Sequence, residues 1–133
     1  MADMKALRSS VANMCADLVA SVGVPFASTT ELQRQMLACF AFGMTFAIGR
    51  TEHLTPPEVQ ALSITMLMDA FKYSGHQAAA FSSHLIESAG GTGNPAIQAI
   101  IHRGIDGHRQ WSSGQILELS KNINPVFQTV GDR

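Results

Sequence analysis

Charge is scarce in this chain of 133 residues. Nine Lys and Arg and ten Asp and Glu make up 14% of the sequence, against about 25% in an average soluble domain. The formal net charge is −1 at pH 7, so the chain lacks the basic excess by which proteins bind nucleic acids or anionic membranes. A weakly charged surface is easily desolvated, which favours a protein that buries part of its surface against a partner or a second copy.

Cysteines and long apolar runs are scarce as well. Cys15 and Cys39 lie in apolar helical patterns without the ligand spacing of a zinc site, and we expect both to be free, buried thiols. The longest apolar run, 36–48, is shorter than the about 20 residues that span a bilayer. Asn13 and Asp17 interrupt the apolar N-terminal stretch in which a signal peptide needs continuity. We therefore expect a cytoplasmic protein without a membrane span.

Strand signals are almost absent, because no stretch alternates apolar and polar residues with β-branched enrichment. Apolar residues recur instead at helical spacing. Together with the helix start and stop signals, this pattern predicts an all-α protein, a single compact domain of about six helices over residues 1–133. The expected helices cover residues 3–22, a segment that starts after Thr29 or Thr30, 55–74, 76–88, 94–111, and a segment that starts near Ser113.

The second expected helix is apolar almost all round, which predicts a central position in the domain. Phe42 and Phe46 add a second face, and Gly43 permits a close helix crossing. Its core stripe consists of Leu32, Met36, Leu37, Phe40, Met44 and Ile48.

Proline and capping residues mark several helix boundaries. Thr55, followed by two prolines and Glu58, has the pattern of a capping box. The pair at 94–95, Asn-Pro, predicts another helix start. Pro125 is expected to break or kink the last helix.

The rare residue types gather in the segment His102–Trp111. These ten residues hold two of the five His, two Arg, one Asp and the only Trp. The concentration indicates a functional surface, although a solvated helix end with local ion pairs would also explain it. Gly104 and Gly107 each cost about 1 kcal/mol relative to Ala inside a helix, which indicates that another backbone or a partner approaches closely.

A helical wheel separates the polar residues of this segment. His102, Asp106 and Arg109 follow one another at i, i+4 and i+7 and share a face, so the Asp can pair with both neighbours. Arg103 lies beside this face and His108 lies nearer to the core stripe.

A second concentration of unusual residues is Lys72, Tyr73 and His76. Tyr, Trp and Arg are the residue types that most often anchor protein interfaces. If this turn packs beside Trp111, the two segments form one aromatic and basic patch. Alternatively, Tyr73 and Trp111 only cap the core with their polar ends in water.

Enzymatic alternatives have weaker support. His102 and Asp106 could supply two metal ligands, with His76 or His84 as a third, but no HExxH or paired Glu-xx-His motif is present. No serine-nucleophile elbow or P-loop occurs either. We assign no catalytic residue, metal ligand or cofactor. A small metal-dependent hydrolase using His102, Asp106 and His84 and a homodimeric structural protein stay as alternatives.

Four blocks of the sequence resemble a known family. They are LTPPEVQ at 54–60, FKYS at 71–74, AAFSSHLI at 79–86, and the segment from GNP at 93–95 to Trp111. Over roughly residues 30–120 the chain resembles a small all-α family of immunity proteins from bacterial polymorphic toxin systems. The resemblance implies a cytoplasmic inhibitor, encoded beside a secreted toxin, that neutralises this cognate toxin domain by covering its active site.

The resemblance carries no catalytic residues with it. It makes polar positions in the matched blocks candidates for toxin contact or for structural support of the contact surface. A net charge of −1 is unlike the strong acidity of many inhibitors of basic nucleases, so the toxin need not be a nuclease. His76 and Trp111, from the two concentrations of unusual residues, complete the set. The candidate partner-binding residues are then Lys72, Tyr73, His76, His84, His102, Arg103, Asp106, His108, Arg109 and Trp111.

Overall fold

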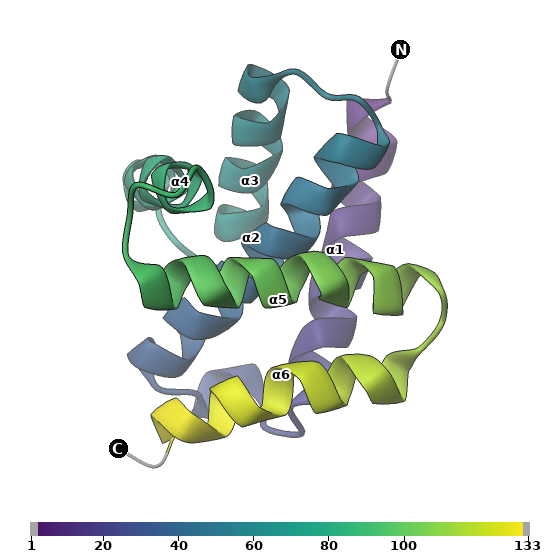
Figure 1. The fold of residues 1–133 in the computed structure, drawn as a ribbon, viewed down its shortest axis with the longest axis vertical. Helices are drawn as coiled ribbons and strands as arrows, with labels where there is room; N and C mark the ends of the chain where they lie inside the picture. Colours follow the sequence, from purple (N-terminus) through teal and green to yellow (C-terminus); the bar gives the residue numbers. More distant parts are fainter. Residues whose placement is uncertain (1–2, 132–133) are drawn as a thin grey trace.

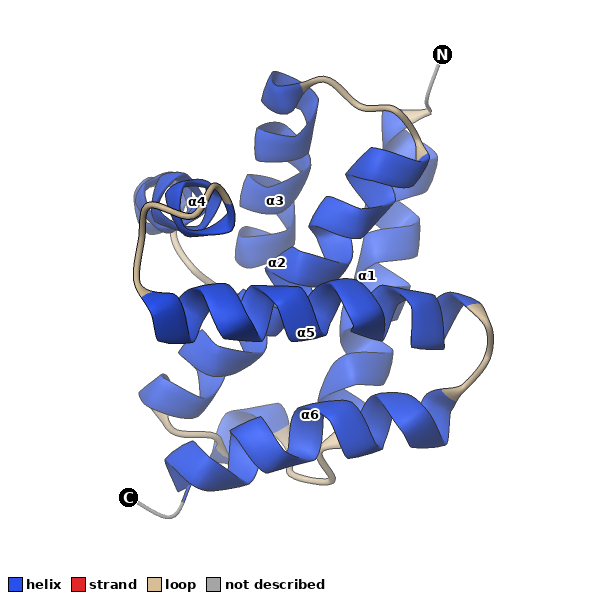
Figure 2. Cartoon of the chain, in the orientation of Figure 1, coloured by secondary structure: helices blue, strands red, loops and turns tan. Residues whose placement is uncertain are grey.

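Residues 3–131, which the computed structural model describes, form six α-helices and no strand (Figures 1 and 2). The predicted all-α fold, a single domain, is therefore confirmed. A single turn of 3₁₀-helix, η1, which the sequence pattern did not reveal, follows the first helix. The elements are α1 (Met4–Ser21), η1 (Phe26–Ser28), α2 (Glu31–Thr51), α3 (Pro56–Phe71), α4 (Gly75–Ala89), α5 (Pro95–Ser112) and α6 (Ile116–Gly131).

The second helix is central, as its composition predicts. The whole segment from Leu37 to Thr45 is buried, and Phe40 and Phe42 are fully inaccessible to solvent. In Figure 1, α5 crosses in front of α2 and α6 lies beside α5, while α1 lies behind and α3 flanks the upper half of α2. Leu32 is an exception to the predicted stripe, because it sits in the first turn of α2 and is 41% exposed.

Two glycines set the crossing of α2 and α5. A Cβ atom on Gly43 would collide with the carbonyl oxygen of Ile101, and one on Gly104 would collide with the carbonyl oxygen of Phe40. On either glycine, the added Cβ would also lie only 3.0 Å from the Cα of the other. The two backbones are therefore in direct contact, and the close approach predicted from Gly43 and Gly104 is that of one helix to another.

Capping residues explain most helix starts. Thr55 accepts from the backbone N–H of Glu58 at 3.3 Å, while the Glu58 carboxylate accepts from the backbone N–H of Thr55 at 2.8 Å. The predicted capping box is thus formed. Thr30 and Ser74 begin α2 and α4 with boxes of the same kind, and Asn94 caps α5.

Two boundaries differ from the prediction. Helix α3 ends at Phe71, before the expected end at residue 74, because Lys72 takes a left-handed backbone conformation with φ 64°. Glycine is the usual residue in that conformation at a helix end. Helix α6 begins at Ile116, and it continues through Pro125 instead of ending there. Pro125 is exposed, so the carbonyl that loses its helical partner can be hydrated.

Both cysteines are buried and free, as predicted. Burial raises the pKa of the Cys15 and Cys39 thiols to about 12, so they act as small apolar side chains. Within residues 3–131, no helix combines the length and hydropathy required to cross a membrane.

Candidate functional site

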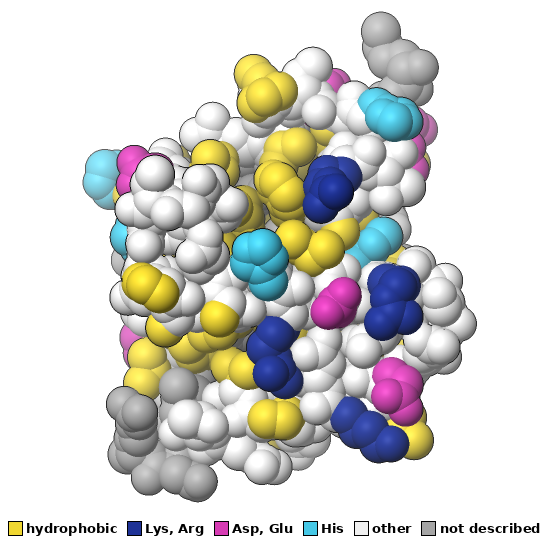
Figure 3. Space-filling model, in the orientation of Figure 1, with side chains coloured by type: hydrophobic (Ala, Val, Ile, Leu, Met, Phe, Trp, Pro, Cys, Tyr) yellow, Lys and Arg dark blue, Asp and Glu magenta, His cyan; other side chains and the backbone are white. Residues whose placement is uncertain are grey.

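The outer face of α5 carries three polar side chains that are free of internal contacts. His102, Asp106 and Arg109 are exposed, and within residues 3–131 none of their side chains makes a hydrogen bond or ion pair. The predicted shared face therefore exists, but the predicted pairing of Asp106 with its two neighbours is wrong. Figure 3 views this face, along which histidine, acidic and basic side chains follow α5.

The inner face of α5 explains the glycines of the His102–Trp111 segment. Gly104 and Gly107 are both buried. A Cβ on Gly107 would lie 2.6 Å from the Phe40 ring and 3.3 Å from Leu119. These glycines allow α5 to pack closely on α2 and α6. The close packing requires residues without a Cβ atom, although glycine lowers helix propensity.

Arg103 joins α5 to α6. Its guanidinium donates to the backbone carbonyl of Asn122, and the Asn122 side-chain amide donates back to the carbonyl of Arg103 at 2.9 Å. The same amide donates to the side chain of Gln110 at 3.1 Å. This half-buried arginine therefore positions α6 against α5, and its guanidinium is less available to a partner than that of an exposed arginine.

Trp111 joins α5 to α1. The indole N–H donates to the carboxylate of Asp17 over 2.8 Å, and the ring lies 6.4 Å from that of His108. Burial lowers the pKa of His108 below its ordinary value, so its neutral form is favoured in the folded protein. Both residues are half-buried, and the bond from Trp111 to Asp17 fixes the C-terminal end of α5 on α1.

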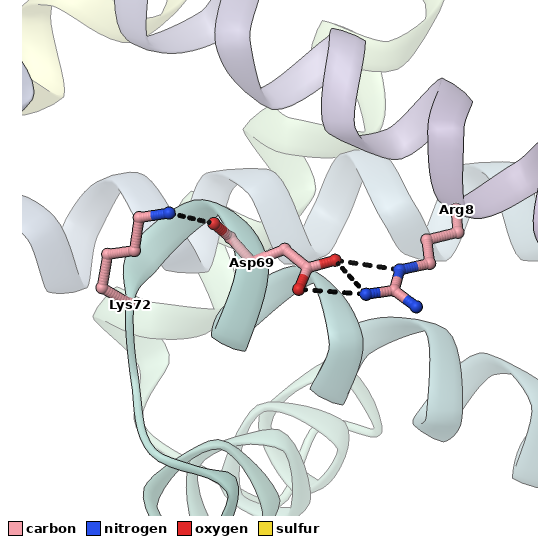
Figure 4. A network of polar contacts seen from close by, with 3 residues as sticks. All are labelled: Arg8, Asp69 and Lys72. Carbon is pink, nitrogen blue, oxygen red and sulfur yellow. Dashed lines mark hydrogen bonds and ion pairs between the residues drawn. The ribbon is translucent and has the colours of Figure 1, made fainter.

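The turn between α3 and α4 is also held by internal contacts. The Lys72 ammonium donates to the carbonyl of Asp69 at 2.9 Å, and the Asp69 carboxylate pairs with Arg8 of α1 at 3.0 Å (Figure 4). Tyr73 packs edge-on against Phe81 with ring centroids 5.6 Å apart. Its hydroxyl is buried without a hydrogen-bond partner within the described residues.

The two concentrations of unusual residues are separate. Trp111 contacts α1, while Tyr73 lies near the N-terminal turn of α2, where burial and the charge of Glu31 raise its pKa. Figure 1 places the connection from α3 to α4 and the C-terminal end of α5 on opposite sides of the molecule. His76 and His84 are exposed on α4. Within residues 3–131, no aromatic contact or hydrogen bond links Tyr73 to Trp111, which leaves the idea of a single patch without structural support.

An apolar groove lies beside the polar face of α5, and the sequence pattern did not reveal it. Its volume is about 420 Å³, and it is formed by the C-terminal half of α2, the following connection, the start of α3, and α4. Figure 3 shows hydrophobic side chains between α2 and α3, on the same face as the charged residues of α5. The prolines after Thr55 line this groove, whereas the sequence suggested only their role in starting a helix. The apolar lining includes Phe46, Leu54, Pro56, Pro57, Val59 and Ile86.

The residues considered as metal ligands do not form a site. Within residues 3–131, no three or more His, Cys, Asp or Glu side chains lie close enough together to hold a metal ion. His84, His102 and Asp106 thus do not form a three-ligand group, and the metal-dependent hydrolase gains no support.

Comparison of the chain with known protein families shows which family it belongs to. A family model described as Immunity protein 48 matches residues 8–131. The chain belongs to the Immunity protein 48 family. The match covers more of the chain than the resemblance at residues 30–120, and it includes most of α1 and all of α6. No curated protein and no solved structure matches the chain. Membership of Immunity protein 48 implies a toxin as the partner, in general terms.

Proposed function

We propose that this protein binds a cognate secreted bacterial toxin and neutralises it by covering the active site of the toxin domain. The match of residues 8–131 to Immunity protein 48 is the observation that carries this proposal. The protein would act in the cytoplasm of the toxin-producing cell, as part of a polymorphic toxin system, and without enzymatic activity of its own.

The outer face of α5 is the proposed contact surface. His102, Asp106 and Arg109 are exposed and make no internal polar contact within the described residues, so binding would not have to break existing bonds. Arginine is enriched among the residues that dominate binding energy in interfaces. A rigid helix also presents its side chains without loss of backbone entropy.

The other candidate residues receive supporting roles in this proposal. Arg103 and Trp111 hold α5 against α6 and α1, and His108 lies beside the Trp111 ring, so the three would maintain the contact surface. Lys72 and Tyr73 stabilise the turn before α4. His76 and His84 are exposed on α4 and stay candidates for contact at the edge of the surface.

Co-expression in a bacterial host with the toxin domain encoded by the adjacent gene tests the proposal, together with titration calorimetry on the purified pair. We expect wild-type protein to restore growth and to bind the toxin domain. Arg109→Ala should weaken binding about tenfold, the loss expected when a central interface arginine is truncated, while the fold stays intact.

Lys5→Ala is the matched control, because Lys5 is an exposed cation on α1. It should bind as the wild type does. Failure of the wild-type protein to protect or bind would refute the function, whereas normal binding by Arg109→Ala would refute only the assignment of the α5 face.

A further inference from the structure

The apolar groove between α2, α3 and α4 has the form of an anchor pocket. We infer that it receives one bulky apolar side chain of the toxin, flanked by a carboxylate that pairs with Arg50. This inference rests on the proposed function and adds the chemistry of the partner at one position. The volume of about 420 Å³ lies within the range of about 300–1,000 Å³ that is typical of pockets for small ligands.

The walls of the groove are apolar and partly open to water. Ile86 is 38% exposed, although isoleucine is among the residues most often buried. Phe46 on α2, Leu54 in the connection that follows, and Val59 on α3 also line the groove and are half-buried. An apolar side chain seated between these walls would remove their remaining surface from water, which is favourable in proportion to the area buried.

The floor of the groove is firmly packed. A Cβ atom on Gly49 would lie 2.7 Å from a methyl group of Val59, which shows how closely α2 and α3 approach at this point. Pro56 and Pro57 fix the backbone where α3 begins. A groove with such a floor exists before binding, so an incoming side chain does not have to order it.

Arg50 determines which polar group the occupant of the groove should carry. This residue belongs to the lining, it is exposed, and no acidic side chain of residues 3–131 pairs with it. Arg50 lies in the last turn of α2, where the helix dipole favours a cation. This interaction does not occupy the N–H donors of its guanidinium. A carboxylate is the group that an arginine fork binds most strongly, often through two parallel hydrogen bonds. The occupant should therefore carry an acidic group next to its apolar side chain.

The groove between α1 and α3 differs in this respect. Several of its charged residues satisfy one another, because Arg8 pairs with Asp69 across the two helices, and Lys72 bonds to the carbonyl of Asp69 (Figure 4). Its arginine is therefore already paired, and the cation that also lines it without an ion pair within the described residues, Lys5, lacks the two-pronged guanidinium that binds a carboxylate through parallel hydrogen bonds. Hydrophobic side chains between α2 and α3, two of the helices that line the groove at Arg50, lie on the same face of the molecule as the charged side chains along α5 (Figure 3). An apolar anchor beside polar contacts is the usual composition of a protein interface.

Three variants at two positions test the inference, with the toxin domain from the adjacent gene as the probe. Ile86→Arg places a charged side chain in the groove and should weaken binding about 30-fold or more, as for a residue at the centre of an interface. Arg50→Glu should weaken binding about tenfold through repulsion of the partner carboxylate, and Arg50→Lys should recover part of that loss. Both positions are on the surface, and circular dichroism would verify that each variant is folded.

Matched controls are available on other parts of the chain. Met68→Arg places the same charge at an apolar residue that is 42% exposed and outside the groove, and Lys5→Glu reverses an exposed cation on α1. Both controls should bind the toxin like the wild type. Wild-type affinity for Ile86→Arg and Arg50→Glu would overturn the inference and leave the proposed function intact.

The second copy of the chain is the competing occupant. If light scattering shows a wild-type dimer that Ile86→Arg converts to a monomer, the groove is filled by the chain itself and the inference is wrong. If the wild-type protein neither binds nor protects against the toxin, the proposed function fails and the inference fails with it.

Discussion

At the scale of single residues, the segment His102–Trp111 divides its side chains between two tasks. His102, Asp106 and Arg109 face solvent, while Arg103 and Trp111 hold neighbouring helices. The helical wheel predicts the first group because it depends only on spacing within one helix. It cannot predict the second group, since Asp17 lies 94 positions before Trp111 in the sequence and becomes its partner only in the fold.

His108 makes the stability of the fold dependent on pH. Burial lowers its pKa in the folded protein, while the unfolded chain titrates near the ordinary histidine value of about 6.5. Its contribution to stability is therefore complete above that value. It declines as the pH falls below it towards the folded pKa, because the unfolded state binds the proton first.

We expect His108→Gln to remove this part of the pH dependence. Urea unfolding of wild type and variant at several values between pH 8 and pH 5 measures the effect as a change in the free energy of unfolding. The stability of the wild type relative to the variant should fall as the pH falls. A constant difference between them across this range would show that His108 does not couple folding to protonation.

At the scale of elements, the crossing of α2 and α5 determines the position of the proposed contact face. The backbones are in contact at Gly43 and Gly104, and this contact sets the distance between α2 and α5 and with it the position of the outer face of α5. The sequence predicts the central helix, the capping box at Thr55 and a close approach at the glycines. It does not predict that Lys72 ends α3, because a positive φ is uncommon for lysine.

Gly104→Ala should destabilise the protein by about 3 kcal/mol, at the upper end of the cost of overpacking a core. The added methyl group collides with the backbone of α2, which cannot move away as a flexible side chain could. This loss exceeds the gain in helix propensity of about 1 kcal/mol from replacing glycine. Urea unfolding of the purified variant measures the change.

Gly75→Ala is the control for this prediction. A Cβ at Gly75 would make only an ordinary contact of 3.8 Å with Met68, so this variant should unfold close to the wild type. Equal stability of Gly104→Ala and Gly75→Ala would show that the two helices do not meet as closely as described.

At the scale of the whole molecule, the protein carries little charge, and several of its cations form no ion pair within the described residues. The net charge is −1, and residues 3–131 form two ion pairs, Arg8–Asp69 and Lys121–Glu118. Several of the cations that remain, Arg50 and Arg109 among them, are exposed. The groove at Arg50 combines three helices and one connection, and no pattern within a single helix would have revealed it.

This charge distribution predicts that association with the toxin depends weakly on salt. Long-range steering arises from strong, complementary electrostatic fields on the two partners, and it raises association rates by about 10-fold to 1,000-fold. A chain of net charge −1 supplies almost no long-range field, so binding would depend on short contacts at the groove and the α5 face. We expect the association rate, measured by stopped flow, to fall less than about tenfold between low salt and 0.5 M NaCl, where charges beyond a few ångström are screened. A fall of about 100-fold or more would mean that charge steers this complex, in contradiction to the near-neutral surface.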